Sequence, residues 1–139
     1  LVYKKQIALY AGGDYEGISK DPHLFYFYAS VATGKKVEEV ESALYEEIEK
    51  LKNEPVTERE IEKAKNQLEA SFVMSQDSVF YQGMLLGKYE TVGDWRLKDK
   101  YLEGIRKVTK DDLQRVVKKY FTEDNRTVGI LIPLPPKGP

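Results

Sequence analysis

The sequence has no cysteine and only one histidine among its 139 residues. The absence of cysteine excludes disulfide bonds and thiolate metal sites. With His23 as the single histidine, no zinc site that needs two imidazole ligands can form within the chain. Long hydrophobic runs are also missing, and no stretch approaches the ~20 apolar residues of a membrane-spanning helix. The sequence therefore gives no indication of a membrane span.

Positive and negative charges nearly cancel, with 22 Lys and Arg against 23 Asp and Glu. No basic stripe is interleaved with aromatic residues that could stack on bases. Nucleic-acid binding depends on such a concentration of positive charge, so nucleic acid is not an expected partner. The length of the chain suits a single domain.

Two segments near the start of the chain predict a β-hairpin. The first, Val2–Tyr10, mixes β-branched, aromatic and polar residues and precedes Gly12-Gly13-Asp14, which is typical of a turn. The second, His23–Thr33, is dense in aromatic residues, which favours a strand. We expect the two strands to be antiparallel and joined by a loop of about ten residues.

Helical periodicity begins at Val37, where apolar residues recur on one face and charged residues on the other. Thr57 and Glu60 have the spacing of a capping box, in which each side chain bonds the backbone of the other residue. Gly83 and Gly87 weaken the helical pattern after Ser78, which either continues the preceding helix or opens a new one. The expected helices cover residues 37–51, 57–72, 78–89, 94–108 and 109–121.

The last periodic segment, Thr127–Ile132, predicts a strand that ends at Pro133. Strands and helices are thus segregated along the chain, which favours an α+β fold. We expect an antiparallel sheet of about three strands packed against four to five helices. Residues 1–133 are expected to form one domain, and residues 134–139 a proline-rich tail.

The first residues predict that the chain begins inside a strand, because Leu1-Val2-Tyr3 runs into Lys4–Tyr10 with no turn residue before it. About three strands also make a narrow sheet for so many helices. We therefore expect a fragment of a larger domain, with further strands and any targeting signal upstream. No signal-peptide pattern opens the sequence itself, and the compartment stays open.

The order and spacing of these segments resemble one protein family. The run GKKVEEVESALYEEIEKLKNEPVTEREIEKAKNQLEASF, residues 34–72, is similar to the carboxy-terminal domain of the insulinase/pitrilysin-type zinc metallopeptidases. This family includes bacterial relatives of the mitochondrial processing peptidase. Val108–Leu113 and Asn125–Gly129 match the closing helix and strand of that domain. The resemblance spans the chain up to Pro133.

The resemblance implies a catalytic zinc ion that is bound outside this chain. The family uses an inverted H-x-x-E-H motif, with two His ligands, a downstream carboxylate ligand and a Glu that activates the metal-bound water. The chain has one histidine, His23, and no His-Glu pair near it. Zinc is therefore expected on a partner, either the amino-terminal zinc-bearing domain or a sister subunit, and the chain alone is expected to be inactive.

The resemblance also implies a substrate-binding role for Tyr3. The second domain of the family carries an R-E-K-x-G-L-x-Y element, whose arginine and tyrosine reach across the closed chamber to the substrate. Leu1-Val2-Tyr3 matches the last three positions of this element, and the arginine would precede Leu1. The phenol of Tyr3 could donate to an oxyanion. Packing within a strand is the alternative role for such an aromatic residue.

Other candidate residues have simpler structural interpretations. A metal role for His23 would need partner ligands that the sequence does not show. The run Phe25–Tyr28 alternates phenylalanine with tyrosine, so that one pair faces the helices and the other faces away. The resemblance implies that the outward face lines the proteolytic chamber, where Tyr26 and Tyr28 would contact peptide. Aromatic cross-strand pairing is the favoured alternative for these tyrosines.

The function implied is that of a non-catalytic, chamber-forming carboxy-terminal segment of a zinc-dependent endopeptidase acting on peptides or extended protein segments. One alternative is a scaffold subunit of the same superfamily, and a second is a stand-alone binding module. An H-x-x-E-H motif encoded upstream would favour the peptidase, and a start methionine directly before Leu1 would favour the module. A free sheet edge could also pair with a second copy, so self-association is a further hypothesis.

Overall fold

The computed structural model describes residues 1–133; the tail expected at residues 134–139 lies outside the described residues. Two strands precede all the helices of the described chain, which confirms the expected α+β class. In chain order the elements are β1 (Ala8–Tyr15), β2 (Phe25–Val31), α1 (Val37–Asn53), α2 (Glu58–Ser75), α3 (Val79–Val92), the 3-10 helix η1 (Trp95–Lys100), α4 (Tyr101–Lys107) and α5 (Lys110–Tyr120).

β1 and β2 form the expected antiparallel hairpin, with Gly12 opposite Tyr28 and Tyr15 opposite Phe25. The loop between the strands covers residues 16–24. The register shifts between Ala8 and Tyr10, so the first part of β1 is irregular. β1 nevertheless begins and ends later in the sequence than expected.

The expectation that the first strand starts at Val2 is wrong, because residues 2–5 form a turn. The Ile7 amide donates to the carbonyl oxygen of Leu1 over 3.2 Å and closes this turn. Gln6 has a φ of 51°, in the left-handed region that interrupts an extended chain. An ion pair between Lys5 and Glu46 joins the turn to α1.

The expectation of a turn at Gly12-Gly13-Asp14 is also wrong, because all three residues lie within β1. The two glycines are explained by aromatic rings of the hairpin that occupy the space of a side chain. A Cβ atom on Gly12 would lie 2.7 Å from the hydroxyl oxygen of Tyr28. A Cβ atom on Gly13 would lie 3.1 Å from the ring of Phe25. Glycine inside a strand thus marks close packing here.

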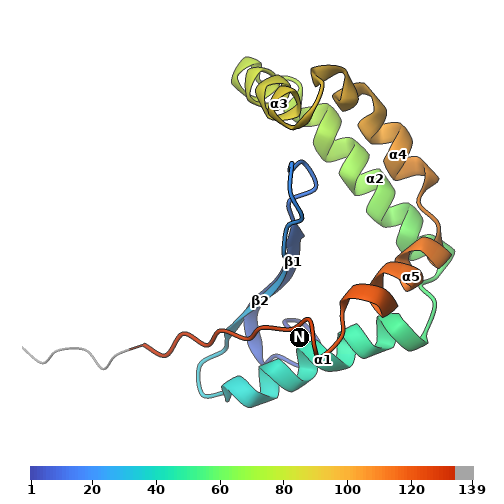
Figure 1. Ribbon diagram of the computed structural model, residues 1–139. Coiled ribbons are helices and arrows are strands. Elements are labelled where there is room, and N and C mark those ends of the chain that lie inside the picture. The colour runs from blue at the N-terminus through green and yellow to red at the C-terminus, as the bar shows by residue number, and fades with distance from the viewer. Residues whose placement is uncertain (134–139) are drawn as a thin grey trace, which may run out of the picture.

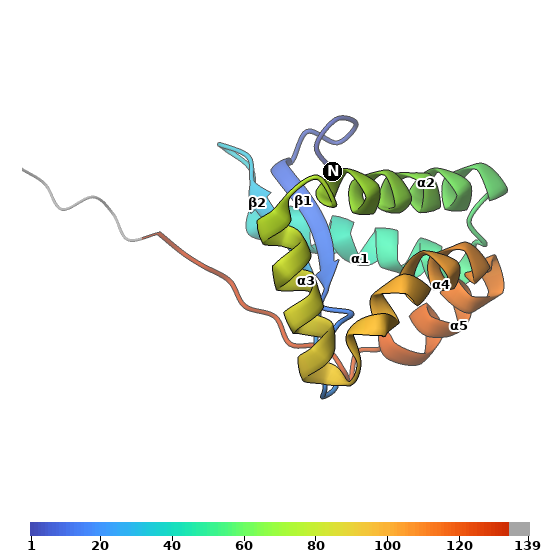
Figure 2. The ribbon, with the colours of Figure 1, turned by 90° about the horizontal axis from the view of Figure 1, so that it is seen from above.

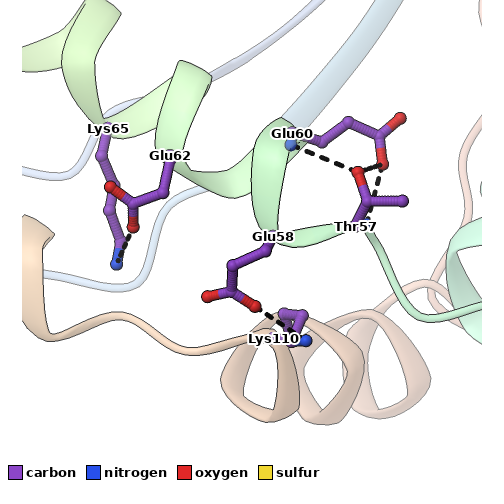
Figure 3. A network of polar contacts seen from close by, with 6 residues as sticks. All are labelled: Thr57, Glu58, Glu60, Glu62, Lys65 and Lys110. Carbon is purple, nitrogen blue, oxygen red and sulfur yellow. Dashed lines mark hydrogen bonds and ion pairs between the residues drawn. The ribbon is translucent and has the colours of Figure 1, made fainter.

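Side-chain caps start most of the expected helices. The Thr57 side chain accepts from the Glu60 amide, while the Glu60 carboxylate accepts from the Thr57 amide over 2.8 Å (Figure 3). This confirms the capping box at the start of α2. In the same region Lys110 lies 2.8 Å from Glu58, which links the first turn of α5 to that of α2 (Figure 3).

The two alternatives for the segment after Ser78 are now resolved, since α3 is a new helix capped by the Ser78 side chain. Asp94 caps the 3-10 helix η1, which leads directly into α4. Thr109 caps α5 and forms a second capping box with Asp112. These starting points agree with the turn and capping residues of the sequence.

The third strand expected at Thr127–Ile132 is not formed. Among the described residues the sheet has two strands, and no backbone hydrogen bond joins residues 127–132 to another segment. The segment therefore has strand-forming residues without a neighbouring strand. All of its residues are exposed, so water can satisfy its backbone donors and acceptors.

Figure 1 shows the hairpin between two groups of helices. α1 and α5 contact each other at one end of the hairpin, whereas α2 contacts α4. α3 lies near the loop of the hairpin and runs across the direction of α2 (Figure 2). Buried apolar side chains are spread over these groups instead of forming one centre: Ala8, Val40, Ala43, Ile61, Leu85, Tyr89 and Val117.

We predict that replacing Thr57 with Ala lowers the free energy of unfolding by about 1 kcal/mol, because the Glu60 amide loses its side-chain acceptor. Urea unfolding followed by helical circular dichroism measures the change. Thr57→Ser keeps the hydroxyl and serves as the matched control. Equal stability of the alanine variant and the parent protein would show that the cap contributes nothing.

Candidate functional site

A groove of about 1350 Å³ lies between the hairpin and the α1–α5 pair. One wall is β2, the floor is formed by α1 and α5, and the other wall is the segment 122–130. The apolar stripe that the sequence places on α1 faces this groove with Val40, Leu44 and Ile48. Val128 and Ile130 face it from the opposite wall.

The hairpin is attached to the helices through an aromatic cluster at the end of α5. The ring of Phe121 lies edge-on to Phe25 and to Phe27, with ring centroids 5.1 Å apart in both pairs. Edge-to-face contacts of this kind add to the stabilisation from buried area. Tyr15 stacks on Phe25 and extends the cluster to β1. The phenylalanine pair therefore faces the helices.

A polar cluster lies at the border of the groove. The Tyr45 hydroxyl donates to the Glu41 carboxylate over 2.6 Å, and the Arg126 guanidinium lies 4.2 Å from the centre of the Tyr45 ring. Burial, together with the hydrogen bond to Glu41, raises the pKa of Tyr45. Tyr45 therefore stays neutral, and Arg126 holds the start of the last segment against α1.

The opposite face of the hairpin carries the tyrosines. The Tyr28 ring covers Gly12, whereas Phe25 and Phe27 cover Gly13. Because neighbouring strand residues point to opposite faces, Tyr28 lies on the face away from Phe121. Its ring is tilted against Tyr10, with centroids 6.3 Å apart.

Tyr26 lies two residues before Tyr28 and therefore shares this outward face. Cross-strand aromatic pairing thus accounts for Tyr28, whose ring meets that of Tyr10. Tyr10, Tyr26 and Tyr28 are all exposed. They form an outward surface that we call the tyrosine face.

The two individual candidate residues of the sequence analysis, Tyr3 and His23, are both exposed. Tyr3 lies in the turn before β1 and is 93% exposed. His23 lies in the hairpin loop, and no group of three His, Cys, Asp or Glu side chains within residues 1–133 could hold a metal ion with it. Tyr3 precedes β1 and His23 lies in the loop that follows it, so the structure does not bring these two residues together.

Among the polar contacts that sequence reasoning missed, two show what a local signal can and cannot predict. The first is Glu41–Tyr45, whose i, i+4 spacing on one helix could have indicated it. The second joins the hairpin loop to α3, where Lys88 lies 2.6 Å from Glu16. The hydrogen bond from Lys88 lowers the pKa of Glu16, so this carboxylate is ionised near neutral pH. No local signal predicts a pair so distant in sequence.

Among residues 1–133 no helix has the length and hydrophobicity that a bilayer crossing requires. Chemically, the described part of the chain offers apolar and aromatic surfaces for binding, and it has no group of three His, Cys, Asp or Glu side chains that could hold a metal ion. A role in binding or in assembly is therefore the chemistry that these surfaces support.

Comparison with known proteins identifies the relatives of the chain. The family described as "Peptidase M16 inactive domain" matches residues 1–68. An uncharacterised zinc protease of Rickettsia felis is 33% identical over 114 residues, which cover 81% of this chain and 27% of that protein. A second one, from Rickettsia bellii, is 30% identical over the same share of each chain. The chain thus spans about a quarter of the length of these curated relatives.

Solved structures share the fold. The inactive peptidase domain of a candidate zinc protease from Bordetella parapertussis matches with a TM-score of 0.83 and 26% identity, covering 97% of this chain and 73% of that one. A protease from Helicobacter pylori matches with a TM-score of 0.81 and 26% identity, covering 89% of this chain and 30% of that one. The arrangement of strands and helices is therefore that of an inactive peptidase domain.

We predict that Phe121→Ala lowers the free energy of unfolding by about 2–3 kcal/mol, because both edge-on contacts with the hairpin are lost. Phe80→Ala is the matched control, since Phe80 is 81% exposed and should change stability by less than about 0.5 kcal/mol. Urea unfolding of both variants measures the difference. Similar losses in the two variants would contradict the role of Phe121.

Proposed function

Because this chain belongs to the peptidase M16 inactive-domain family, we propose that it forms part of the non-catalytic wall of the substrate chamber in a zinc endopeptidase. The observation that carries this proposal is the match to an inactive domain by a chain with a single histidine. Catalysis then belongs to a separate zinc-bearing domain or sister subunit. The relatives of the same family, described as zinc proteases, support a zinc-dependent parent.

The residues of this chain do not fit a zinc site. Zinc in a catalytic site takes three protein ligands from His, Cys, Asp or Glu and leaves one position open. The chain has no cysteine and only His23 as an imidazole ligand. No cluster of three such side chains is present within the described residues. No step of the reaction is therefore assigned to a metal bound here.

We assign substrate contact to the tyrosine face. In an extended peptide every second side chain points to the same face, and the backbone donors and acceptors are free to form hydrogen bonds. Exposed tyrosine offers a ring for packing and a hydroxyl for hydrogen bonding. Tyr26 and Tyr28 therefore suit a surface along which many sequences can bind. The substrate class proposed is a peptide or an unfolded segment of a protein.

Tyr3 is the single residue to which we assign a direct role in the reaction. It matches the tyrosine of the substrate-binding element in the family that the chain resembles. Its side chain is 93% exposed, so its hydroxyl is available to a substrate bound against the domain. A phenol can donate to the oxyanion that develops when water attacks a peptide carbonyl. The proposed role of Tyr3 is therefore to position or stabilise that oxyanion.

We further propose that residues 1–133 act as one domain with the zinc-bearing partner. The salt bridges between segments distant in sequence, such as Glu16–Lys88 and Glu58–Lys110, support a single structural unit. A scaffold subunit of the same superfamily would use the same domain without the peptidase reaction. An H-x-x-E-H motif in the partner would favour the peptidase, and its absence would favour the scaffold.

We predict that the 139-residue chain alone binds no stoichiometric zinc and cleaves no peptide, because it has one histidine and no cysteine. Metal analysis after dialysis and a fluorogenic peptide assay with and without a chelator measure both properties. One tightly held zinc ion per chain, or proteolysis that the chelator abolishes, would contradict the assignment of catalysis to a partner.

We predict that Tyr3→Phe in the complete enzyme lowers kcat by roughly 10- to 100-fold with little change in KM, because the donor acts on the transition state. Tyr120→Phe is the matched control, as it removes the hydroxyl of another exposed tyrosine that lies on α5 and outside the tyrosine face. Steady-state kinetics on one peptide substrate compare the variants. An unchanged kcat in Tyr3→Phe would remove Tyr3 from the reaction.

A further inference from the structure

The tyrosine face has a glycine at its centre. In the register of the hairpin Gly12 lies opposite Tyr28, and on the outward side of β1 it is flanked by Tyr10 and Asp14. Glycine inside a strand is unfavourable, because it loses more backbone freedom on folding than other residues and has no side chain to pack. Gly12 therefore needs a reason other than strand formation.

The neighbouring Gly13 has its reason in the packing of the other face. A Cβ atom there would lie 3.1 Å from the ring of Phe25 and 3.4 Å from that of Phe27, and both rings are held in the cluster around Phe121. No such cluster holds Tyr28, which is 48% exposed and could turn its ring into solvent. Packing of the interior thus explains Gly13 and leaves Gly12 unexplained.

The ring of Tyr28 lies flat across Gly12. A Cβ atom on Gly12 would be 2.7 Å from Oη, 2.8 Å from Cζ and 2.9 Å from Cε2 of the ring. Because these three distances are nearly equal, the Cβ atom would meet the face of the phenol and not its edge. The opposite face of the ring is then turned away from the strand. A residue without a side chain is required for this close approach.

Tyr10 borders the same ring from the side. The ring centroids of Tyr10 and Tyr28 are 6.3 Å apart, and the ring planes are tilted by 59°. The backbone at Gly12 and the ring of Tyr10 together restrict the position of Tyr28. A side chain that is already ordered loses less conformational freedom when a ligand binds to it.

We propose that Gly12 is a positioning residue for the substrate, because it allows the Tyr28 ring to lie flat and ordered on β1. This inference rests on the proposed contact between the tyrosine face and an extended peptide. A flat ring lets the peptide approach the sheet closely and offers it a planar surface for packing. Gly12 acts through Tyr28 and needs no contact of its own with the substrate.

A purely structural role is the alternative for Gly12. An aromatic ring that covers a strand glycine stabilises the sheet without any ligand. In that case a substitution of Gly12 changes the stability of the domain and leaves substrate binding unchanged. Kinetic constants and urea unfolding, measured on the same variants, therefore separate the two roles.

The substitution Gly12→Ala in the complete enzyme tests the proposal, since the added methyl group displaces the Tyr28 ring. We expect KM for a peptide substrate to rise about 3- to 10-fold, because the ordered ring is lost. We expect kcat to stay unchanged, because the contact is made equally before and during the reaction.

Gly13→Ala is the matched control. It adds the same methyl group to the adjacent residue, but on the phenylalanine face. It should lower the midpoint of urea unfolding and leave KM unchanged. An equal rise of KM in both glycine variants would contradict the proposal.

A double-mutant cycle with Tyr28→Ala tests whether Gly12 acts through the ring. Tyr28→Ala alone should raise KM, and adding Gly12→Ala to it should have no further effect. Equal rises of KM from Gly12→Ala with and without the Tyr28 ring would contradict the proposed route. Loss of folding in Gly12→Ala would also overturn the proposal, because it would show that Gly12 serves the fold.

The same cycle separates this inference from the function on which it rests. If Tyr28→Ala raises KM and Gly12→Ala does not, Gly12 has no positioning role, while the contact of Tyr28 with the substrate stands. If Tyr28→Ala leaves KM unchanged, the proposed contact of Tyr28 is wrong, and the role of Gly12 is wrong with it.

Discussion

The contact of Phe121 with Phe25 and Phe27 is the constraint on which the rest of the structure depends. It joins the hairpin to the end of α5, and α5 is joined to α1 by a hydrogen bond from the Gln114 side chain to the carbonyl oxygen of Lys52. The sheet and the helical layer are thereby held at the two sides of one groove.

Local signals in the sequence predicted most of the helices, although they left open whether α3 is a new helix and did not separate η1 from α4. Thr57, Ser78 and Thr109 each cap a helix, and a cap is encoded within three residues of the position it stabilises. The limits of β1 could not be predicted in this way. Gly12 and Gly13 are typical of a turn, yet they lie in a strand because rings from β2 fill the space beside them. That information comes from the partner strand, not from the local sequence.

In the candidate site, too, some features could be predicted from the sequence and others could not. The alternation of phenylalanine and tyrosine in β2 predicted two faces of different character, and the faces are found as expected. The position of Arg126 over Tyr45 could not be predicted, because a contact between residues so far apart needs the packed fold. Thr127–Ile132 has the composition of a strand, but a strand forms only beside another, and the described chain does not supply its neighbour.

The two faces of the hairpin can serve different purposes without conflict. The phenylalanine face is committed to packing, because any change there alters the joint with α5. The tyrosine face contributes less to stability, since Tyr26 and Tyr28 are exposed and their substitution removes little buried area. Residues that contribute little to stability are free to be selected for binding. The tyrosine face is therefore available for the proposed contact with a substrate, while the phenylalanine face holds the hairpin against α5.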